Sequence, residues 1–191
     1  MATDVDSLTD EQWKTASLCT GWNVMQVLGH MTSAATSNAG RFVSGLVKAG
    51  FKFNRMAETD IARETAGGPA ETLARFKAAV NLSQHPPGPT PTWLGETIVH
   101  GEDIRRPLGI THSYDPDGLR IVADFFKGSN LIIGAKTRIA GLTLKATDLD
   151  WTTGSGPLVE GPLLSLVMSM AGRKPAYDDL TGDGMATLRS R

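Results

Sequence analysis

Apolar residues recur at helical spacing through the first two thirds of the chain. After "TGW", Asn23 can cap a helix and Gln26 can reach back to it, as in a capping box. One apolar stripe follows, made up of Val24, Val27, Leu28, Met31 and Ala35. The pattern predicts a helix that continues to about Val47 and ends at Gly50.

Three further helices are predicted from the same kind of pattern. "GGPAETLARFKAAVNLSQ" places Pro69 near a first turn and an apolar side behind it, formed by Leu73, Phe76 and Val80. After the proline-rich loop "HPPGPTP", Thr90 can cap a helix that has Pro91 at its first position and closes at Pro107 and Gly109. "DPDGLRIVADFFKGSN" predicts one more helix over residues 117–127.

The pattern of hydrophobic and polar residues changes after Asn130. "LTLKATDLDWTTGSGPLVEG" alternates and is rich in β-branched residues and turn glycines, which predicts two or three strands. "PLLSLVMSMAGR" predicts a short apolar helix that ends at Gly172. The fold class is therefore mainly α, with a helical domain over residues 1–130 and a small α+β unit over residues 131–191.

Composition narrows the class of protein. The chain has 191 residues, 40% hydrophobic and 20% charged, with a net charge of −1, as in ordinary globular domains. A nucleic-acid partner would require a broader basic stripe than the pair Arg105 and Arg106. The start of the chain lacks the apolar core of a signal peptide, and the longest apolar run, residues 162–171, is too short to span a bilayer. We expect a cytoplasmic protein with no membrane partner.

The residues best suited to catalysis or metal binding lie in the segment "PTWLGETIVHGEDIRRPLG". At ~100° per residue, Glu96, His100 and Asp103 fall on the same face as Trp93 and Ile104. Carboxylates on an apolar face are rare unless they are paired or bind a metal. Glu96 and His100, one turn apart, can both reach one ion.

A third ligand has to come from elsewhere in the chain. His85 and His112 lie in loops beside proline or glycine, whereas His30 lies in a predicted helix at the edge of its apolar stripe. His30 therefore suits a ligand in the helical core best. Two histidines and one carboxylate leave a position open, as in a catalytic zinc site, and Asp103 can accept the other N–H of an imidazole.

Plainer interpretations remain open on the residues alone. A Glu-x-x-x-His pair often makes only a local contact within a helix. Cys19 can be a small buried hydrophobe, or a thiol with a lowered pKa near a helix N-terminus. Trp22 and Trp93 suit packing anchors. Arg173 suits a surface or C-capping cation, or a residue that reaches a carboxylate substrate.

Three segments carry a family resemblance: "LTDEQWKTASLCTGWNVMQVLGHM", "TWLGETIVHGEDIRRPLG" and "TGSGPLVEGPLLSLVMSMAGR". Together they resemble the mycothiol-dependent maleylpyruvate isomerase family, part of the DinB-like metalloenzymes. The resemblance implies a four-helix bundle with a divalent metal, usually zinc, held by His30, Glu96 and His100. It also implies a sterol-carrier-like C-terminal unit in which Arg173 matches an arginine that assists with the substrate.

The resemblance implies further features. Family members usually have a longer helix before "LTDEQW", so the first helix is expected to be short here. The cofactor implied is mycothiol, whose thiol would add to an electrophile such as maleylpyruvate and then either be expelled, giving a cis-trans isomerase, or be retained, giving an S-transferase. Two alternatives stay open: a zinc-hydroxide hydrolase with Asp103 as general base, and a non-enzymatic protein that binds a hydrophobic ligand.

Overall fold

The chain was analysed as a computed structural model, which describes residues 1–131 and 133–191. It forms two compact units, Met1–His112 and Ser113–Arg191. The mainly helical class expected from the sequence is confirmed, with one small three-stranded sheet among the described residues. No helix in the described part of the chain is long and apolar enough to cross a membrane.

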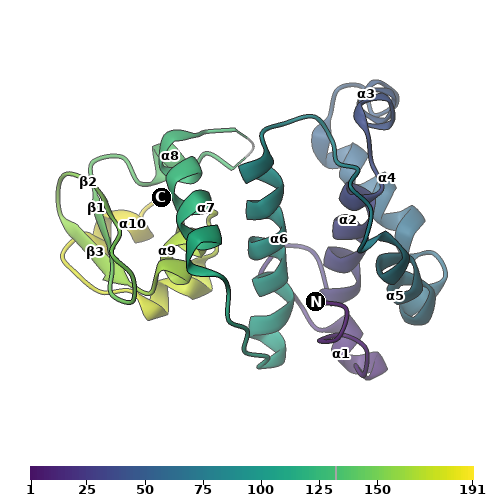
Figure 1. The fold of residues 1–191 in the computed structure, drawn as a ribbon, viewed down its shortest axis with the longest axis horizontal. Coiled ribbons are helices and arrows are strands. Elements are labelled where there is room, and N and C mark those ends of the chain that lie inside the picture. Colours follow the sequence, from purple (N-terminus) through teal and green to yellow (C-terminus); the bar gives the residue numbers. More distant parts are fainter. Residues whose placement is uncertain (132) are drawn as a thin grey trace. The chain divides into compact units, whose positions relative to one another are not determined.

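The first unit contains helices only. They are α1 (Asp10–Lys14), α2 (Val24–Ala35), α3 (Ala39–Lys48), α4 (Phe53–Thr65), α5 (Gly68–Ala79), α6 (Thr90–Arg105) and the 3₁₀ turn η1 (Arg106–Leu108). Helix α2 is central: α6 packs on one side of it, and α4 and α5 pack on the other (Figure 1). One core cluster joins α1, α2, α5 and α6, formed by Val5, Trp13, Val24, Val27, Leu28, Phe76 and Ile104.

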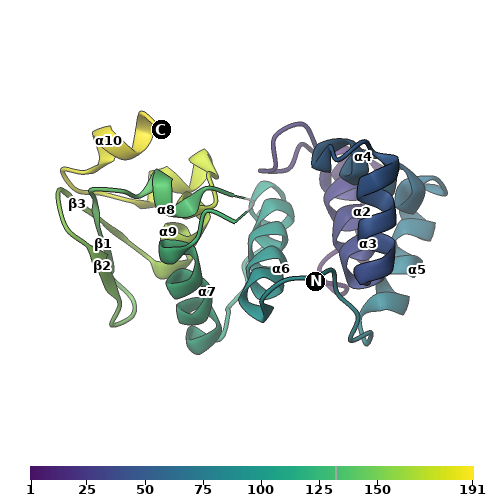
Figure 2. The ribbon, with the colours of Figure 1, turned by 90° about the horizontal axis from the view of Figure 1, so that it is seen from above.

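The second unit is built around the apolar helix α9. Its elements are α7 (Pro116–Gly128), α8 (Ala135–Arg138), β1 (Thr143–Ala146), β2 (Thr152–Gly154), β3 (Leu158–Gly161), α9 (Leu163–Met170), η2 (Lys174–Asp179) and α10 (Met185–Arg189). The sheet order is β2-β1-β3, with β1 antiparallel to β2 and parallel to β3. Helix α9 packs against α7, β1 and β3 (Figure 2).

Several local predictions are confirmed. The capping box at the start of α2 is formed by Asn23 and Gln26. The backbone N–H of each residue donates a hydrogen bond to the side-chain oxygen of the other, with a length of 2.9 Å in both cases. Helix α7 and the apolar helix α9 occur where the sequence placed them, and Gly109 and Gly172 adopt the left-handed conformation after their helices. Residues 2–7, which precede the stretch "LTDEQW", form turns, and the first helix, α1, begins within that stretch.

The prediction of one helix up to residue 47 is wrong. Helix α2 ends at Ala35, and a new helix, α3, begins at Ala39 because the side chain of Asn38 accepts a hydrogen bond from the backbone N–H of Arg41. Helix α4 was not predicted at all. Its buried residues, Met56, Ala57, Ile61 and Glu64, include a carboxylate and make a weak apolar stripe.

Two smaller expectations also differ from the structure. Val80 is exposed, and the buried side of α5 consists of Thr72, Phe76 and Ala79. Helix α6 begins one residue earlier than expected, with Pro89 rather than Thr90 at the cap. Helix α7 was grouped with the helical domain in the sequence, whereas it lies in the second unit and packs against α9 through its apolar side.

Candidate metal centre

Helix α2, which carries His30, packs between α6 and α4. It approaches α4 closely at Gly29. A Cβ atom at Gly29 would lie 2.7 Å from Cγ2 of Thr65 on α4, which is too close for any larger residue without movement. The glycine therefore lets the two helices pack tightly at the position just before His30. The imidazole that follows is mostly buried, with a side-chain exposure of 16%.

Helix α6 supplies the carboxylates and the second imidazole. Ten of its sixteen residues are buried, including His100, Glu102 and Asp103. Glu96, His100 and Asp103 follow each other at intervals of four and three residues, so they share the face predicted from the sequence. Polar groups buried in this way need partners, and here they find them in one another.

The side chains from the two helices meet at one carboxylate oxygen. Nε2 of His30 lies 3.3 Å from Oε2 of Glu96, and Nε2 of His100 lies 3.2 Å from the same oxygen. One ligand atom from each residue lies within 4.8 Å of the others. The structure thus brings together residues 30, 96 and 100, the set that the sequence singled out.

Asp103 orients the imidazole of His100 through the ring nitrogen that faces away from Glu96. Its Oδ2 lies 2.8 Å from Nδ1 of His100, and its side chain is fully buried. A carboxylate at this distance holds the proton on Nδ1 and directs Nε2 toward Glu96. The backbone carbonyl of Asp103 also accepts a hydrogen bond from the N–H of Leu18, 3.1 Å away, which joins α6 to the segment before α2.

The cluster perturbs the ionisation of its members. Burial by itself would lower the pKa of His100, but hydrogen bonds to Asp103 and Glu96 and attraction to both carboxylates raise it to about 9. Burial would raise the pKa of Glu96, but hydrogen bonds and attraction to His100 and His30 outweigh burial and hold it well below its usual range. Without an ion, Glu96 therefore stays charged beside a protonated His100.

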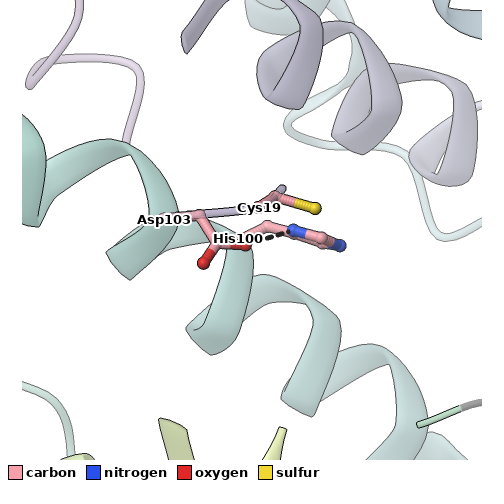
Figure 3. A group of neighbouring side chains, drawn as sticks. All are labelled: Cys19, His100 and Asp103. Atoms are coloured by element: carbon pink, nitrogen blue, oxygen red, sulfur yellow. Dashed lines mark hydrogen bonds and ion pairs between the residues drawn. The ribbon is translucent and has the colours of Figure 1, made fainter. Parts of the chain in front are cut away.

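Cys19 and Trp22 also border the site, although the sequence treated them as packing residues. The thiol of Cys19 lies beside the imidazole of His100, on the segment that precedes α2 (Figure 3). Its sulfur, a ring nitrogen of His100 and a carboxylate oxygen of Asp103 lie within 4.8 Å of one another. The ring of Trp22 lies 5.1 Å from that of His30 and 6.3 Å from that of His100, measured between centroids.

The remaining sequence candidates lie elsewhere. His85 stacks on Trp93 at 5.9 Å between ring centroids, and His112 is exposed. Arg173 lies in the second unit, where its Nη1 donates a hydrogen bond to the carbonyl of Ala171, 3.0 Å away, just beyond the end of α9. This contact matches the C-capping interpretation of Arg173.

Three features of the site escaped sequence reasoning. The proximity of Cys19 to His100 depends on how the segment before α2 crosses α6, and no local pattern encodes that crossing. Trp22 was assigned a packing role without a partner. The packing reason for Gly29 was also missed, although a glycine inside a helical apolar stripe is itself a signal of close backbone approach.

Together the fold and the site define a mainly helical protein with a histidine–glutamate–histidine cluster able to hold a divalent metal ion. Residues 1–84 match the family model described as the mycothiol maleylpyruvate isomerase N-terminal domain, which agrees with the resemblance seen in the first of the three segments. This match includes His30 and ends before α6. No curated protein matches the chain.

Solved structures extend the comparison to nearly the whole chain. The chain is similar to the crystal structure of the mycothiol-dependent maleylpyruvate isomerase, with a TM-score of 0.63 and 16% sequence identity over 95% of this chain and 86% of that one. A structure of the same isomerase with one histidine replaced by alanine gives the same values. At this identity the likeness shows that the fold is shared.

Proposed function

We propose that this protein is a metal-dependent enzyme that activates a low-molecular-weight thiol, mycothiol, for addition to an electrophile. One observation carries the proposal: two imidazole Nε2 atoms from separate helices approach the same oxygen of Glu96 at 3.3 and 3.2 Å. The family match over residues 1–84 and the shared fold support the choice of thiol.

The chemistry of the donor set fits a divalent ion such as zinc. Two imidazole nitrogens and one carboxylate oxygen are the ligands of catalytic zinc sites, which keep a further position for water or substrate. The side chain of Glu96 retains an exposure of 25%, so the cluster is accessible from one side. His30, Glu96 and His100 would hold the ion, and Asp103 would fix the tautomer of His100 by accepting a hydrogen bond from its Nδ1–H.

Each residue of the cluster then has a defined task. A divalent ion at this site would deprotonate a thiol that binds to it, since a coordinated thiol loses its proton outright. Glu96 and the two imidazoles would hold the ion, and Trp22 lies beside both rings as an apolar wall. The thiolate would add to an electron-poor alkene carbon of the substrate; rotation about the resulting single bond and expulsion of the thiolate would restore the double bond as the trans isomer. Retention of the thiol would instead give an S-conjugate.

We also propose that the four helices α2, α4, α5 and α6 form a DinB-like bundle, and that the second unit is sterol-carrier-like. The packing of α2 against the other three helices supports the first assignment. The helices of the second unit, packed against a short mixed sheet, support the other.

The test of the function is turnover by the zinc-loaded protein with mycothiol and a panel of electrophiles that includes maleylpyruvate. We expect His100→Ala to abolish the activity, because it removes a ligand and the partner of Asp103. His112→Ala is the matched control, since that histidine is exposed and should leave turnover intact. Equal turnover by wild type and His100→Ala would refute the role of the cluster, and activity that needs no thiol would indicate a hydrolase instead.

Arg173 is proposed to assist with a carboxylate-bearing electrophile. Arg173→Ala should then raise KM for carboxylate substrates by about tenfold or more, the value of one lost charge-assisted contact, and leave neutral electrophiles unaffected. Arg173→Lys keeps the charge and should recover part of the loss. An equal effect on both substrate classes would assign Arg173 only to the end of α9.

A further inference from the structure

Helix α3 presents an apolar face to solvent. None of its ten residues is buried, and it packs against α4 on its inner side, where Gly45 approaches Met56. On its outer side Val43 and Val47 are exposed by 56% and 54%. Together with Phe51 and Phe53, they account for half of the large hydrophobic residues that are exposed in the described part of the chain.

The turn after α3 extends this face at an energetic cost. Phe51 has a φ of +61°, the left-handed conformation that L side chains rarely adopt, and its side chain is 75% exposed. A large apolar residue in such a conformation costs on the order of 1–2 kcal/mol relative to glycine. An observed backbone outlier that also holds a phenyl ring in water points to a functional role.

The stretch of sequence that forms α3 and the turn after it carries charge of one sign. The sequence contains no aspartate or glutamate between Glu11 and Glu58. Three exposed cations flank the apolar residues, Lys48, Lys52 and Arg55, and none of them forms an ion pair with any described residue. An apolar stripe flanked by unpaired cations is complementary to a lipid bilayer, whose acyl chains are apolar and whose headgroups can be anionic.

We propose that the α3 face, defined as Val43, Val47 and Phe51 with Lys48, Lys52 and Arg55, binds the surface of an anionic lipid bilayer. Phe51 and the valines enter the headgroup boundary, while the cations remain at the phosphates with their alkyl chains alongside. A second copy of this chain fits less well, because its cations would meet those of the first. Side chains exposed by more than half project from the surface, which suits a deformable lipid layer.

This proposal differs from the expectation of no membrane partner, which considered only segments able to span a bilayer. A helix that lies in the interface needs neither the length nor the continuous hydrophobicity of a spanning helix. It is also independent of the proposed metal chemistry, since none of its residues belongs to the cluster around Glu96.

The test is flotation of the full chain with phosphatidylcholine vesicles, with and without phosphatidylglycerol. We expect binding only to the anionic vesicles, weakening as salt is added because the charges are screened. Equal binding to both vesicle types, or binding to neither at low salt, would overturn the proposal. So would concentration-dependent dimerisation that is lost in Val47→Ser without any vesicle binding, since that result identifies a second copy as the occupant.

Two variants separate binding from folding. Phe51→Gly removes the apolar ring and relieves the left-handed strain, so it should weaken partition into anionic vesicles about tenfold while raising Tm. Val47→Ser should weaken partition, whereas the matched control Val80→Ser, at a valine of 56% exposure just after α5, should not. Unchanged partition in Phe51→Gly, or equal losses in the two serine variants, would contradict the proposal.

Discussion

At the scale of single residues, the ionisation of His100 is the most unusual property of the site. Its imidazole lies between two carboxylates, Asp103 on Nδ1 at 2.8 Å and Glu96 on Nε2 at 3.2 Å. Because its pKa is raised to about 9, the imidazole of the metal-free protein is protonated on both nitrogens at neutral pH, and both nitrogens donate. A metal ion must displace the proton on Nε2, and its binding should therefore release protons.

This arrangement predicts a pH-dependent stability of the metal-free protein. The pKa of His100 is raised to about 9 in the folded state, against about 6.5 in the unfolded chain. Its contribution is fully present below about pH 6.5 and is lost as the pH rises through about 9, a loss on the order of 3 kcal/mol. Urea unfolding in the presence of a chelator, at several pH values, measures it.

His100→Gln serves as the control for this measurement, since it removes the titrating group. The variant should show a flatter profile between pH 6.5 and 9 than the wild type. A wild-type protein whose unfolding free energy does not fall over this range would contradict the prediction.

At the scale of elements, the site depends on how closely α2 packs against α4. Gly29 lies at this contact and directly precedes His30, so the helix packing and the position of the ligand are coupled. The resemblance marked the leucine-glycine-histidine sequence as specific, and the structure supplies a packing reason for its glycine.

Gly29→Ala should therefore destabilise the fold and weaken metal binding together. The new Cβ would lie 2.7 Å from Cγ2 of Thr65, and overpacking of this kind costs roughly 1–3 kcal/mol. Denaturant unfolding and zinc titration measure the two effects. The double variant with Thr65→Ser removes the clashing methyl group and should recover both the stability and the affinity for zinc. A Gly29→Ala protein with wild-type stability would contradict the prediction and show that α4 can move to accommodate the new Cβ.

At the scale of the whole molecule, the cluster joins helices that are far apart in the chain. His30 and Glu96 are 66 residues apart, so the unfolded chain does not hold the three ligands together. A metal that binds only the folded state stabilises the first unit by mass action. The four residues of the metal centre, His30, Glu96, His100 and Asp103, all lie in the first unit.

Zinc should accordingly raise the free energy of unfolding, by about 2.7 kcal/mol when its free concentration is 100 times Kd. A chelator should reverse the increase. His30→Ala should abolish the zinc-dependent shift in Tm, whereas His112→Ala should keep it. A shift that persists in His30→Ala would place the bound metal at another site.

The sequence alone was sufficient wherever structure follows from neighbouring residues. The capping box at Asn23, the proline and glycine boundaries of α6, and the single face shared by Glu96, His100 and Asp103 all depend on spacing along one helix. The placement of His30 within a helix also followed from the spacing of its neighbours. These predictions succeeded because a helix fixes the direction of each side chain relative to those three and four positions away.

Every feature that depends on contacts between different helices or segments was decided by the tertiary structure. It divided one predicted helix at Asn38, brought Cys19 and Trp22 to the cluster, and grouped α7 with α9 rather than with the first unit. It also brought His30 within 3.3 Å of Glu96. Contacts between segments distant in sequence depend on how whole faces pack, and the local pattern that defines a helix does not specify which partner its face will meet.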